Sequence, residues 1–270
     1  MAVKRIRHVL GLSGGKDSAA LAVYMREKHP EIIIEYFFCD TGCELNETYE
    51  FLDRLKARLG IQITYLCAER GFDHWLQVYN GFLPSATARW CTKQLKIIPI
   101  EKFIGDDDAV SYIAIRADED RDGYISSKDN INPVFPFKKD GIVKKDVYRI
   151  LDESGIGFPK YYEWRSRSGC YFCFFQRKIE WIGLYDNHPG LFEKAAKYES
   201  EHSDGRRFTW NDNETLIELV ARRDEIIEEY SKVEDRLLNS KRIKSNMTLA
   251  ATLDILDEAE GFNPCSLCHV

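Results

Sequence analysis

The chain has 270 residues, of which 44% are hydrophobic and 13% aromatic, so it can bury a full core and exceeds the length of one average domain. Its net charge of −6 excludes a globally basic nucleic-acid-binding protein but allows a local basic patch. The sequence contains no run of 18 apolar residues and no signal-peptide core, so we expect a soluble cytoplasmic protein without a membrane partner.

The first predicted unit is a strand, a glycine turn and a helix. Residues 7–12 have a β-like composition, and residues 19–25 are apolar with a helical pattern. The loop between them consists of Ser13, Gly14, Gly15, Lys16, Asp17 and Ser18. Glycines let backbone N–H groups approach an anion, hydroxyls and a lysine add donors, and the helix N-terminus adds its dipole. This combination favours a polyphosphate site over a glycine turn with a solvated lysine.

Strand and helix patterns then continue to alternate. The predicted elements are a buried strand at 31–40, a helix at 47–60 that ends at Gly60, and a third strand at 61–66. This alternation predicts an α/β fold with a doubly wound parallel sheet. Because ligands of such sheets bind beyond the carboxyl ends of the strands, we expect Asp40 and Thr41 beside the ligand.

Two later stretches place charges near predicted elements. Residues 89–99 combine basic side chains with Cys91, and Thr92 could cap a helix there, although a solvated basic helix is the usual form of such a sequence. Residues 110–115 predict another strand, which Arg116 follows directly. A charge just beyond a strand end indicates the ligand side of the sheet, and a plain polar loop is the alternative.

The sequence changes character near residue 180. Residues 160–178 carry five basic side chains among Tyr161, Tyr162 and Trp164, a mixture that nucleic-acid surfaces use, although basic clusters also bind ATP. The following residues are strongly charged and helical in pattern. We therefore predict a nucleotide-binding α/β domain at 1–178 and a C-terminal helical region at 179–270.

The eight cysteines are notable in a chain expected in a reducing compartment, which disfavours structural disulfides. Two CxxC pairs, Cys170/Cys173 and Cys265/Cys268, offer four thiolates, the number that an Fe–S cluster or a structural zinc site requires. Buried apolar cysteines, or a C-terminal pair unrelated to Cys170, are the alternatives.

In this order the motifs resemble the phosphoadenosine phosphosulfate (PAPS) reductase family of the PP-loop ATP pyrophosphatases, the adenine nucleotide α-hydrolase-like superfamily. The resemblance covers roughly residues 5–175. The motifs that carry it are the SGGKDS loop, Asp40-Thr41-Gly42 with Glu44, residues 89–99 and 115–119, and Gly169-Cys170. Some members reduce adenylyl sulfate or PAPS to sulfite, and others use ATP to adenylate an acceptor and release pyrophosphate.

The resemblance implies ATP as the nucleotide, with Ser13, Lys16 and Ser18 as catalytic residues that stabilise the departing pyrophosphate. The intact Lys16 and Ser18 favour ATP because a sulfonucleotide offers no β,γ-pyrophosphate to hold. Mg²⁺ would bridge the phosphates, with Asp17 or Asp40 as an outer ligand. The expected nucleotide-binding residues are Ser13, Gly14, Gly15, Lys16, Asp17, Ser18, Asp40, Thr41 and Arg116.

Within the family, the chain looks like the DndC/SspD-type enzymes of DNA phosphorothioation. This resemblance implies DNA or another nucleic acid as acceptor and a cysteine desulfurase as sulfur donor. It also implies a [4Fe–4S] cluster on Cys170 and Cys173, completed by Cys91, Cys265 or Cys268, with structural Zn²⁺ as the alternative. A PAPS or adenylyl-sulfate reductase, and a non-catalytic nucleotide-binding subunit of a defence or modification complex, remain open.

Overall fold

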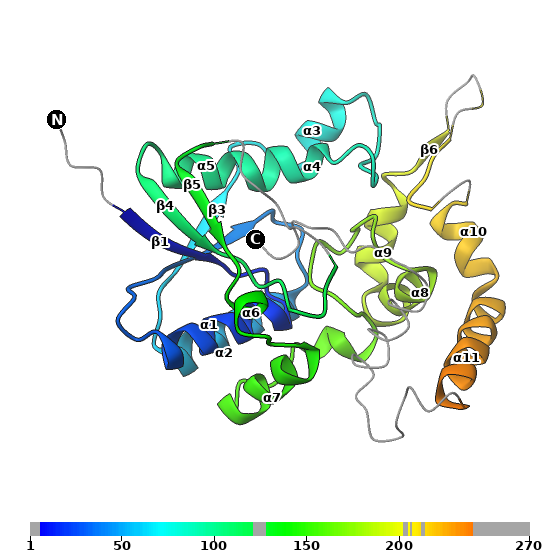
Figure 1. Ribbon diagram of the computed structural model, residues 1–270. Coiled ribbons are helices and arrows are strands. Elements are labelled where there is room, and N and C mark those ends of the chain that lie inside the picture. Colours follow the sequence, from blue (N-terminus) through cyan, green and yellow to red (C-terminus); the bar gives the residue numbers. More distant parts are fainter. Residues whose placement is uncertain (1–5, 121–127, 202–204, 206, 212–213, 240–270) are drawn as a thin grey trace. The chain divides into compact units, whose positions relative to one another are not determined.

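The computed structural model describes residues 6–120, 128–201, 205, 207–211 and 214–239 (Figure 1). These residues form two compact units. Unit 1 contains the described residues of 6–71 and 91–159, and unit 2 contains those of 72–90 and 160–239. The domain boundary predicted after residue 178 stays a prediction.

Unit 1 is built on a five-stranded sheet of order β3-β2-β1-β4-β5, in which all neighbouring strands are parallel. The strands are β1 (Ile6–Gly11), β2 (Glu35–Asp40), β3 (Ile63–Cys67), β4 (Asp108–Tyr112) and β5 (Ile131–Val134). Pro133 lies in the edge strand β5, where its missing N–H costs no ladder bond on the outer side. The chain order reverses at β1, which lies between β2 and β4. The predicted doubly wound α/β fold is confirmed.

Helices cover both faces of this sheet (Figure 1). They are α1 (Lys16–Lys28), α2 (Asn46–Leu59), α4 (Trp90–Thr92), the π-helix η1 (Lys93–Ile97), α5 (Ile98–Ile104), α6 (Pro136–Lys139) and α7 (Lys144–Ser154). The core on one face contains Leu21 of α1, Phe51 of α2 and Leu151 of α7, all fully buried. The helix α2 ends as predicted at Gly60, whose φ of 61° lies in the left-handed region.

The predicted helix cap at Thr92 is wrong. Thr92 has helical backbone angles (φ −62°, ψ −46°) and its side chain makes no cap hydrogen bond. The helical run begins two residues earlier, at Trp90, so Thr92 lies inside it. The π-helix that follows packs against β2. π-Helical turns are rare in proteins.

Unit 2 is organised around stacked aromatic rings. Its elements are α3 (Phe72–Val78), the 3₁₀ helix η2 (Lys160–Glu163), α8 (Lys178–Asn187), α9 (Pro189–Ala196), β6 (Ser200–Glu201), β7 (Arg207–Phe208), α10 (Leu216–Ala221) and α11 (Arg223–Asn239). Phe72 stacks on Trp90 at 5.1 Å between ring centroids, and Phe172 stacks on Trp210 at 5.3 Å. Since all four rings are buried, residues 72–90 belong to this core although they precede it by about 70 residues.

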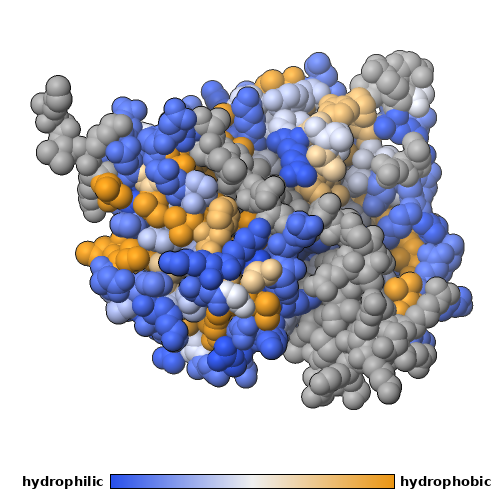
Figure 2. All heavy atoms as spheres, viewed as in Figure 1, coloured by the Kyte–Doolittle hydropathy of each residue, from blue (hydrophilic) through white to orange (hydrophobic). Residues whose placement is uncertain are grey.

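Hydrophilic residues dominate the face shown in Figure 2, with apolar residues in small groups. Large exposed apolar side chains include Ile33 and Ile217, and single exposed side chains of this kind are normal. None of the helices in the described part of the chain is long and apolar enough to cross a membrane.

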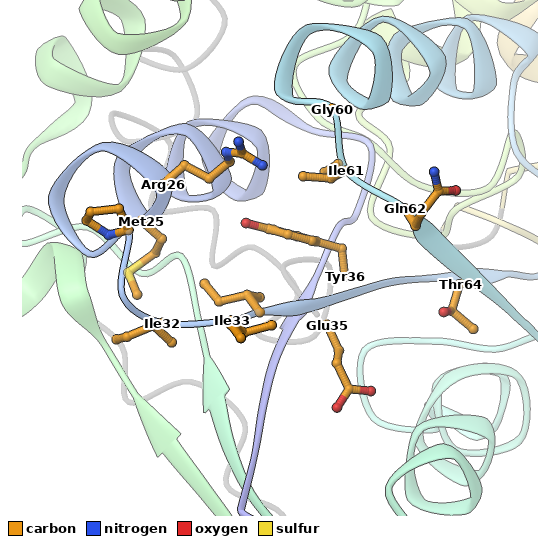
Figure 3. Close-up of a pocket in the computed structure, with 12 residues that line it drawn as sticks. Met25, Arg26, Ile32, Ile33, Glu35, Tyr36, Gly60, Ile61, Gln62 and Thr64 are labelled. Carbon is orange, nitrogen blue, oxygen red and sulfur yellow. The ribbon is translucent and has the colours of Figure 1, made fainter.

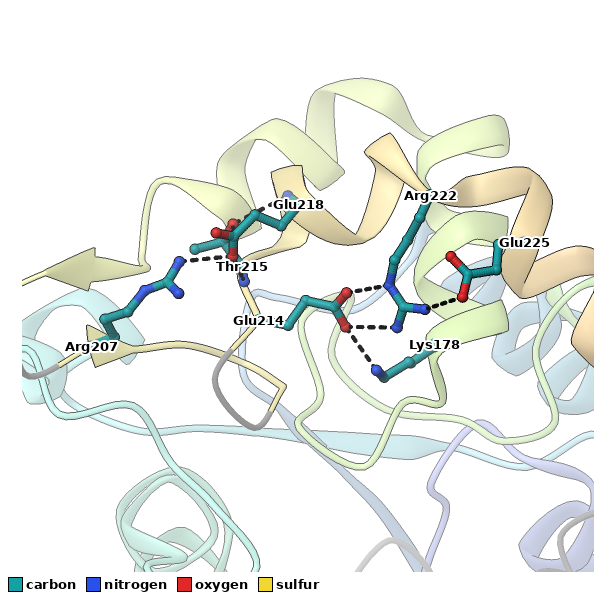
Figure 4. Close-up of polar contacts among 7 residues, drawn as sticks. All are labelled: Lys178, Arg207, Glu214, Thr215, Glu218, Arg222 and Glu225. Atoms are coloured by element: carbon teal, nitrogen blue, oxygen red, sulfur yellow. Dashed lines mark hydrogen bonds and ion pairs between the residues drawn. The ribbon is translucent and has the colours of Figure 1, made fainter.

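A charged network joins α8 to the two C-terminal helices of unit 2 (Figure 4). The Glu214 carboxylate accepts hydrogen bonds from Arg222 and from Lys178 Nζ, the latter at 2.7 Å. Thr215 begins α10 with a capping box, in which its Oγ1 accepts from the Glu218 N–H and Glu218 accepts from the Thr215 N–H. The hydrogen bond from Arg222, helped by Lys178 and opposed by burial, lowers the pKa of Glu214 from 4.5 to about 2.

Substitution Glu214→Gln should lower the free energy of unfolding at pH 7 by about 1 kcal/mol, the upper range for an accessible ion pair. A lowered folded-state pKa contributes stability above the unfolded value and loses it as the pH falls through the folded value. The difference between wild type and variant should therefore shrink between pH 4.5 and about pH 2. Urea unfolding across this pH range measures it.

The matched control is Glu228→Gln, which breaks an exposed i,i+4 pair with Lys232 on α11. This change should cost less than about 0.5 kcal/mol. Equal losses in the two variants would contradict a special contribution from Glu214.

Candidate nucleotide-binding site

The predicted phosphate loop lies at the carboxyl end of β1, where the strand order reverses, and leads into α1. Two serine side chains fix its shape. The Ser13 and Ser18 hydroxyls lie 3.1 Å apart, the Ser13 N–H donates to Ser18 Oγ, and the Gly15 N–H donates to Ser13 Oγ. Ligands of open α/β sheets bind at this type of position, and a helix N-terminus favours anions. The structure thus supplies the strand-loop-helix context that the sequence predicted.

Gly14 allows a neighbouring helix to approach this loop closely. Its φ is +75°, and a Cβ at this position would clash with the Cγ2 methyl of Thr48 in α2. Thr48 is fully buried. Only glycine satisfies both the backbone angle and the contact. The tight backbone and the adjacent Lys16 in the first turn of α1 fit a bound polyphosphate.

Asp17 is the centre of a buried ion-pair network. Its side chain is 4% exposed and lies 3.6 Å from Lys16 Nζ and 2.9 Å from Arg116 Nη1. The Arg116 guanidinium also pairs with Asp118 and Glu119. Burial opposes the charge of Arg116, but the three carboxylates outweigh it and raise its pKa. The structure therefore brings Arg116 to the phosphate loop, where it binds protein carboxylates.

The turn after β2 is organised by Glu44. This carboxylate accepts hydrogen bonds from the Thr41 hydroxyl at 2.7 Å and from the Thr41 and Cys43 N–H groups at 3.2 Å. Asp40 accepts from the Tyr49 hydroxyl at 2.7 Å. Burial raises the pKa of Glu44, although Thr41 and the charge of Lys96 act against it. The predicted residues Asp40 and Thr41 thus share one turn.

Sequence reasoning gave no site role to Glu44 and Tyr49, which hold Asp40 and Thr41 in place. The sequence signal for Glu44 was an acidic residue just after a strand-end turn. The same pattern occurs in ordinary polar loops, and only the burial of this side chain distinguishes it. Tyr49 lies inside an amphipathic helix pattern, so its hydroxyl contact had no sequence signature.

A hollow of about 520 Å³ lies elsewhere in unit 1 (Figure 3). Its lining includes Met25, Arg26, Ile33, Tyr36, Ile61 and Gln62. It adjoins the amino end of β2, whereas the phosphate loop follows the carboxyl end of β1. Since these strands are parallel, the hollow lies at the amino ends of the strands and the phosphate loop at their carboxyl ends.

The predicted thiolate ligands are only partly brought together. Cys170 and Cys173 share one turn of unit 2, in which the Cys173 N–H donates to the Cys170 carbonyl at 3.0 Å. Cys91 belongs to unit 1, and Cys265 and Cys268 lie outside the described residues. No group of three or more metal-ligating side chains occurs among residues that the structure describes. The CxxC turn therefore fits half of a four-thiolate site.

The predicted nucleic-acid surface at 160–178 is wrong in one respect. Tyr161 and Tyr162 are 1% and 5% exposed, and Arg165 and Arg177 are also buried. Buried rings cannot stack on bases, so these tyrosines provide no binding platform. Aromatic side chains bury large areas favourably, and here they serve the interior of unit 2.

Comparison with known proteins supports the predicted family over the nucleotide-binding part of the chain. The family model of the phosphoadenosine phosphosulfate reductase domain matches residues 7–132. This match covers β1 to the start of β5 and includes the phosphate loop, the β2 turn and Arg116. Residues 7–132 are therefore similar to a PAPS reductase domain.

The relatives among curated proteins have no described activity. Two uncharacterised proteins of Methanocaldococcus jannaschii are 28% and 23% identical over 73% and 76% of this chain. The chain spans 43% and 49% of their lengths, respectively. An uncharacterised 37.8-kDa protein of Escherichia phage 186 is 24% identical over 71% of this chain and 74% of that protein.

Two solved structures are similar to the chain. PAPS reductase from Candida auris, in a phosphate complex, has a TM-score of 0.46 and 11% identity over 63% of this chain and 82% of that one. The U34-tRNA thiolase NcsA from Methanococcus maripaludis, with its [4Fe–4S] cluster, has a TM-score of 0.42 and 17% identity over 72% and 71%.

Substitution Gly14→Ala should abolish ATP binding and destabilise the protein by roughly 1–3 kcal/mol, because the new Cβ meets Thr48 Cγ2 and the backbone is strained. Adding Thr48→Ser removes that methyl group and should restore part of the stability. Thermal unfolding and calorimetric ATP titration measure the two effects.

The control is Gly42→Ala, where φ is +69° but no atom lies within 4 Å of the new Cβ. It should show only the backbone cost, about 1 kcal/mol. If Thr48→Ser gives no rescue, the close approach of α2 is not what requires glycine at position 14.

Proposed function

We propose that the protein is an ATP pyrophosphatase that cleaves ATP between its α- and β-phosphates and adenylates an acceptor for sulfur incorporation. The observation that carries this proposal is Lys16, buried in the first turn of α1. It lies in a serine-braced phosphate loop within a region that matches the PAPS reductase domain. A lysine placed there suits a β,γ-pyrophosphate, which PAPS lacks.

The loop residues have distinct roles in this reaction. As the α–β bond breaks, the departing pyrophosphate gains charge, and Lys16 together with the Ser13 and Ser18 hydroxyls stabilises it. Bound Mg²⁺ would neutralise phosphate charge, with Asp17 or Asp40 as its outer ligand. Arg116 orients the Asp17 carboxylate through its 2.9 Å contact.

For the acceptor we propose DNA, modified as a phosphorothioate, with a cysteine desulfurase as sulfur donor. Support comes from the resemblance to DndC/SspD-type enzymes and from the CxxC turn at Cys170 and Cys173. These cysteines would hold a [4Fe–4S] cluster or Zn²⁺ together with ligands from elsewhere in the chain. The group would supply electron-transfer or sulfur chemistry as a cluster, or structural support as zinc.

Reduction of PAPS or adenylyl sulfate to sulfite is the second candidate, because the matching domain model is that of PAPS reductase. Incubation with ATP and separately with PAPS discriminates between the two. Pyrophosphate and AMP from ATP support our proposal, sulfite from PAPS supports the reductase, and nucleotide binding without turnover supports a non-catalytic subunit.

Lys16→Ala should lower pyrophosphate release at least about 100-fold, because one fixed donor to a developing charge contributes that much or more to the rate. A coupled pyrophosphate assay with the full chain and an oligonucleotide acceptor measures it. The matched control is Lys28→Ala, at the exposed far end of the same helix, which should keep full activity. Unchanged release in Lys16→Ala would refute the assignment of the activity to this loop.

A further inference from the structure

A single buried carboxylate closes the loop that contains the CxxC turn. Glu180 of α8 is fully buried. Its Oε1 accepts hydrogen bonds from the N–H and hydroxyl of Ser166, both at 2.7 Å, and its Oε2 accepts from the Arg177 N–H at 2.9 Å. Since Ser166 and Arg177 flank residues 167–176, Glu180 joins the two ends of that loop.

Arg165 braces the same loop from within. Its guanidinium is fully buried and donates to the carbonyls of Gly169 at 3.2 Å and Cys170 at 2.9 Å. Gln176 adds a third brace through its Nε2, which donates to the Tyr171 carbonyl. The backbone around the thiols is thus held by side chains of the chain itself.

Gly169 connects the guanidinium to the second thiol. Its φ is +140°, and a Cβ at this position would contact both Arg165 Nη2, at 3.5 Å, and Cys173 Sγ, at 3.9 Å. The two groups therefore flank one point of the backbone. The loop places a fixed positive charge beside the Cys173 thiol.

Burying the charge of Arg165 costs free energy unless a group of opposite charge compensates it. The hydrogen bonds of Arg165 to Gly169 and Cys170 go to backbone carbonyls, which carry no net charge. Burial would raise the pKa of Glu180, but Arg177, Arg167, the Ser166 N–H and Arg165 outweigh it and lower that pKa. The base of the loop therefore contains an ionised carboxylate surrounded by guanidinium groups.

We propose that Arg165 is a positioning residue for a group bound by Cys170 and Cys173, and that its buried charge selects a thiolate complex of net negative charge. This inference rests on the cysteine site in our proposed function. A [4Fe–4S]²⁺ cluster or Zn²⁺ with four thiolates has a net charge of about −2 and meets this condition. Glu180 sets the loop in the conformation that Arg165 braces.

Metal-free, reduced full-length protein tests the bracing. In hydrogen exchange measured by mass spectrometry, residues 167–176 should exchange at least about tenfold faster in Arg165→Met, because a hydrogen bond to a charged group is lost. Exchange in unit 1 should not change. The control Arg149→Met removes an exposed arginine from α7 and should leave the loop unaffected.

Metal binding tests the selection by charge. With Zn²⁺ alone as the probe, Arg165→Met should bind at least about tenfold more weakly than wild type, and Arg165→Lys, which retains the charge, should recover most of the affinity. A Cys170→Ser/Cys173→Ser variant defines the binding due to other cysteines. Anaerobic reconstitution with ferrous iron and sulfide, followed by iron and sulfide counts, distinguishes a cluster from zinc.

Equal Zn²⁺ affinity and equal loop exchange in wild type, Arg165→Met and Arg165→Lys would overturn the inference. So would a wild type that binds no more metal than the double cysteine variant. If Arg165→Met does not fold, Arg165→Gln, which keeps hydrogen-bond donors but removes the charge, is measured instead and should also bind Zn²⁺ at least about tenfold more weakly than wild type. Lys16→Ala should bind Zn²⁺ normally, so failure of the ATP reaction and failure of this inference are distinguishable.

Discussion

The buried ion pair between Asp17 and Arg116 is the contact on which the nucleotide-binding unit depends. It joins the first turn of α1 to the segment after β4, across 99 positions of sequence. Burying either charge alone would cost several kcal/mol, so the two segments are stable only together. This pairing joins the phosphate loop, which follows β1, to the segment that follows the neighbouring strand β4.

Buried carboxylates organise three loops by the same physical means. Asp17 accepts a hydrogen bond from Arg116 at the phosphate loop. After β2, Glu44 accepts hydrogen bonds from two N–H groups and a hydroxyl. Glu180 accepts hydrogen bonds from both ends of the CxxC loop. A buried carboxylate that accepts several hydrogen bonds fixes the backbone around it.

The similarity to known proteins and the geometry of the phosphate loop support different parts of the proposed function. The family-model match shows that residues 7–132 are similar to a PAPS reductase domain, whereas the proposed choice of ATP over a sulfonucleotide rests on Lys16, Ser13 and Ser18. The acceptor depends on residues outside the matched region. For that part, the structure contributes a braced CxxC turn and shows that Tyr161 and Tyr162 belong to the interior.

The sequence by itself determined the strand, glycine loop and helix of residues 6–28, the alternation that makes the sheet parallel, and the left-handed end of α2 at Gly60. These features depend on local periodicity and on backbone angles that favour glycine, so neighbouring residues suffice to predict them. The candidate loop residues followed from the same local signals.

Only the tertiary structure decided which polar and aromatic residues turn inward. It paired Arg116 with Asp17, buried Tyr161 and Tyr162, and placed Phe72 and Trp90 in the core of unit 2. It also set Arg165 and Glu180 around the CxxC turn. An arginine or a tyrosine has the same sequence signature whether it is solvated or buried, because the contacts that decide between these states come from residues far away in the chain.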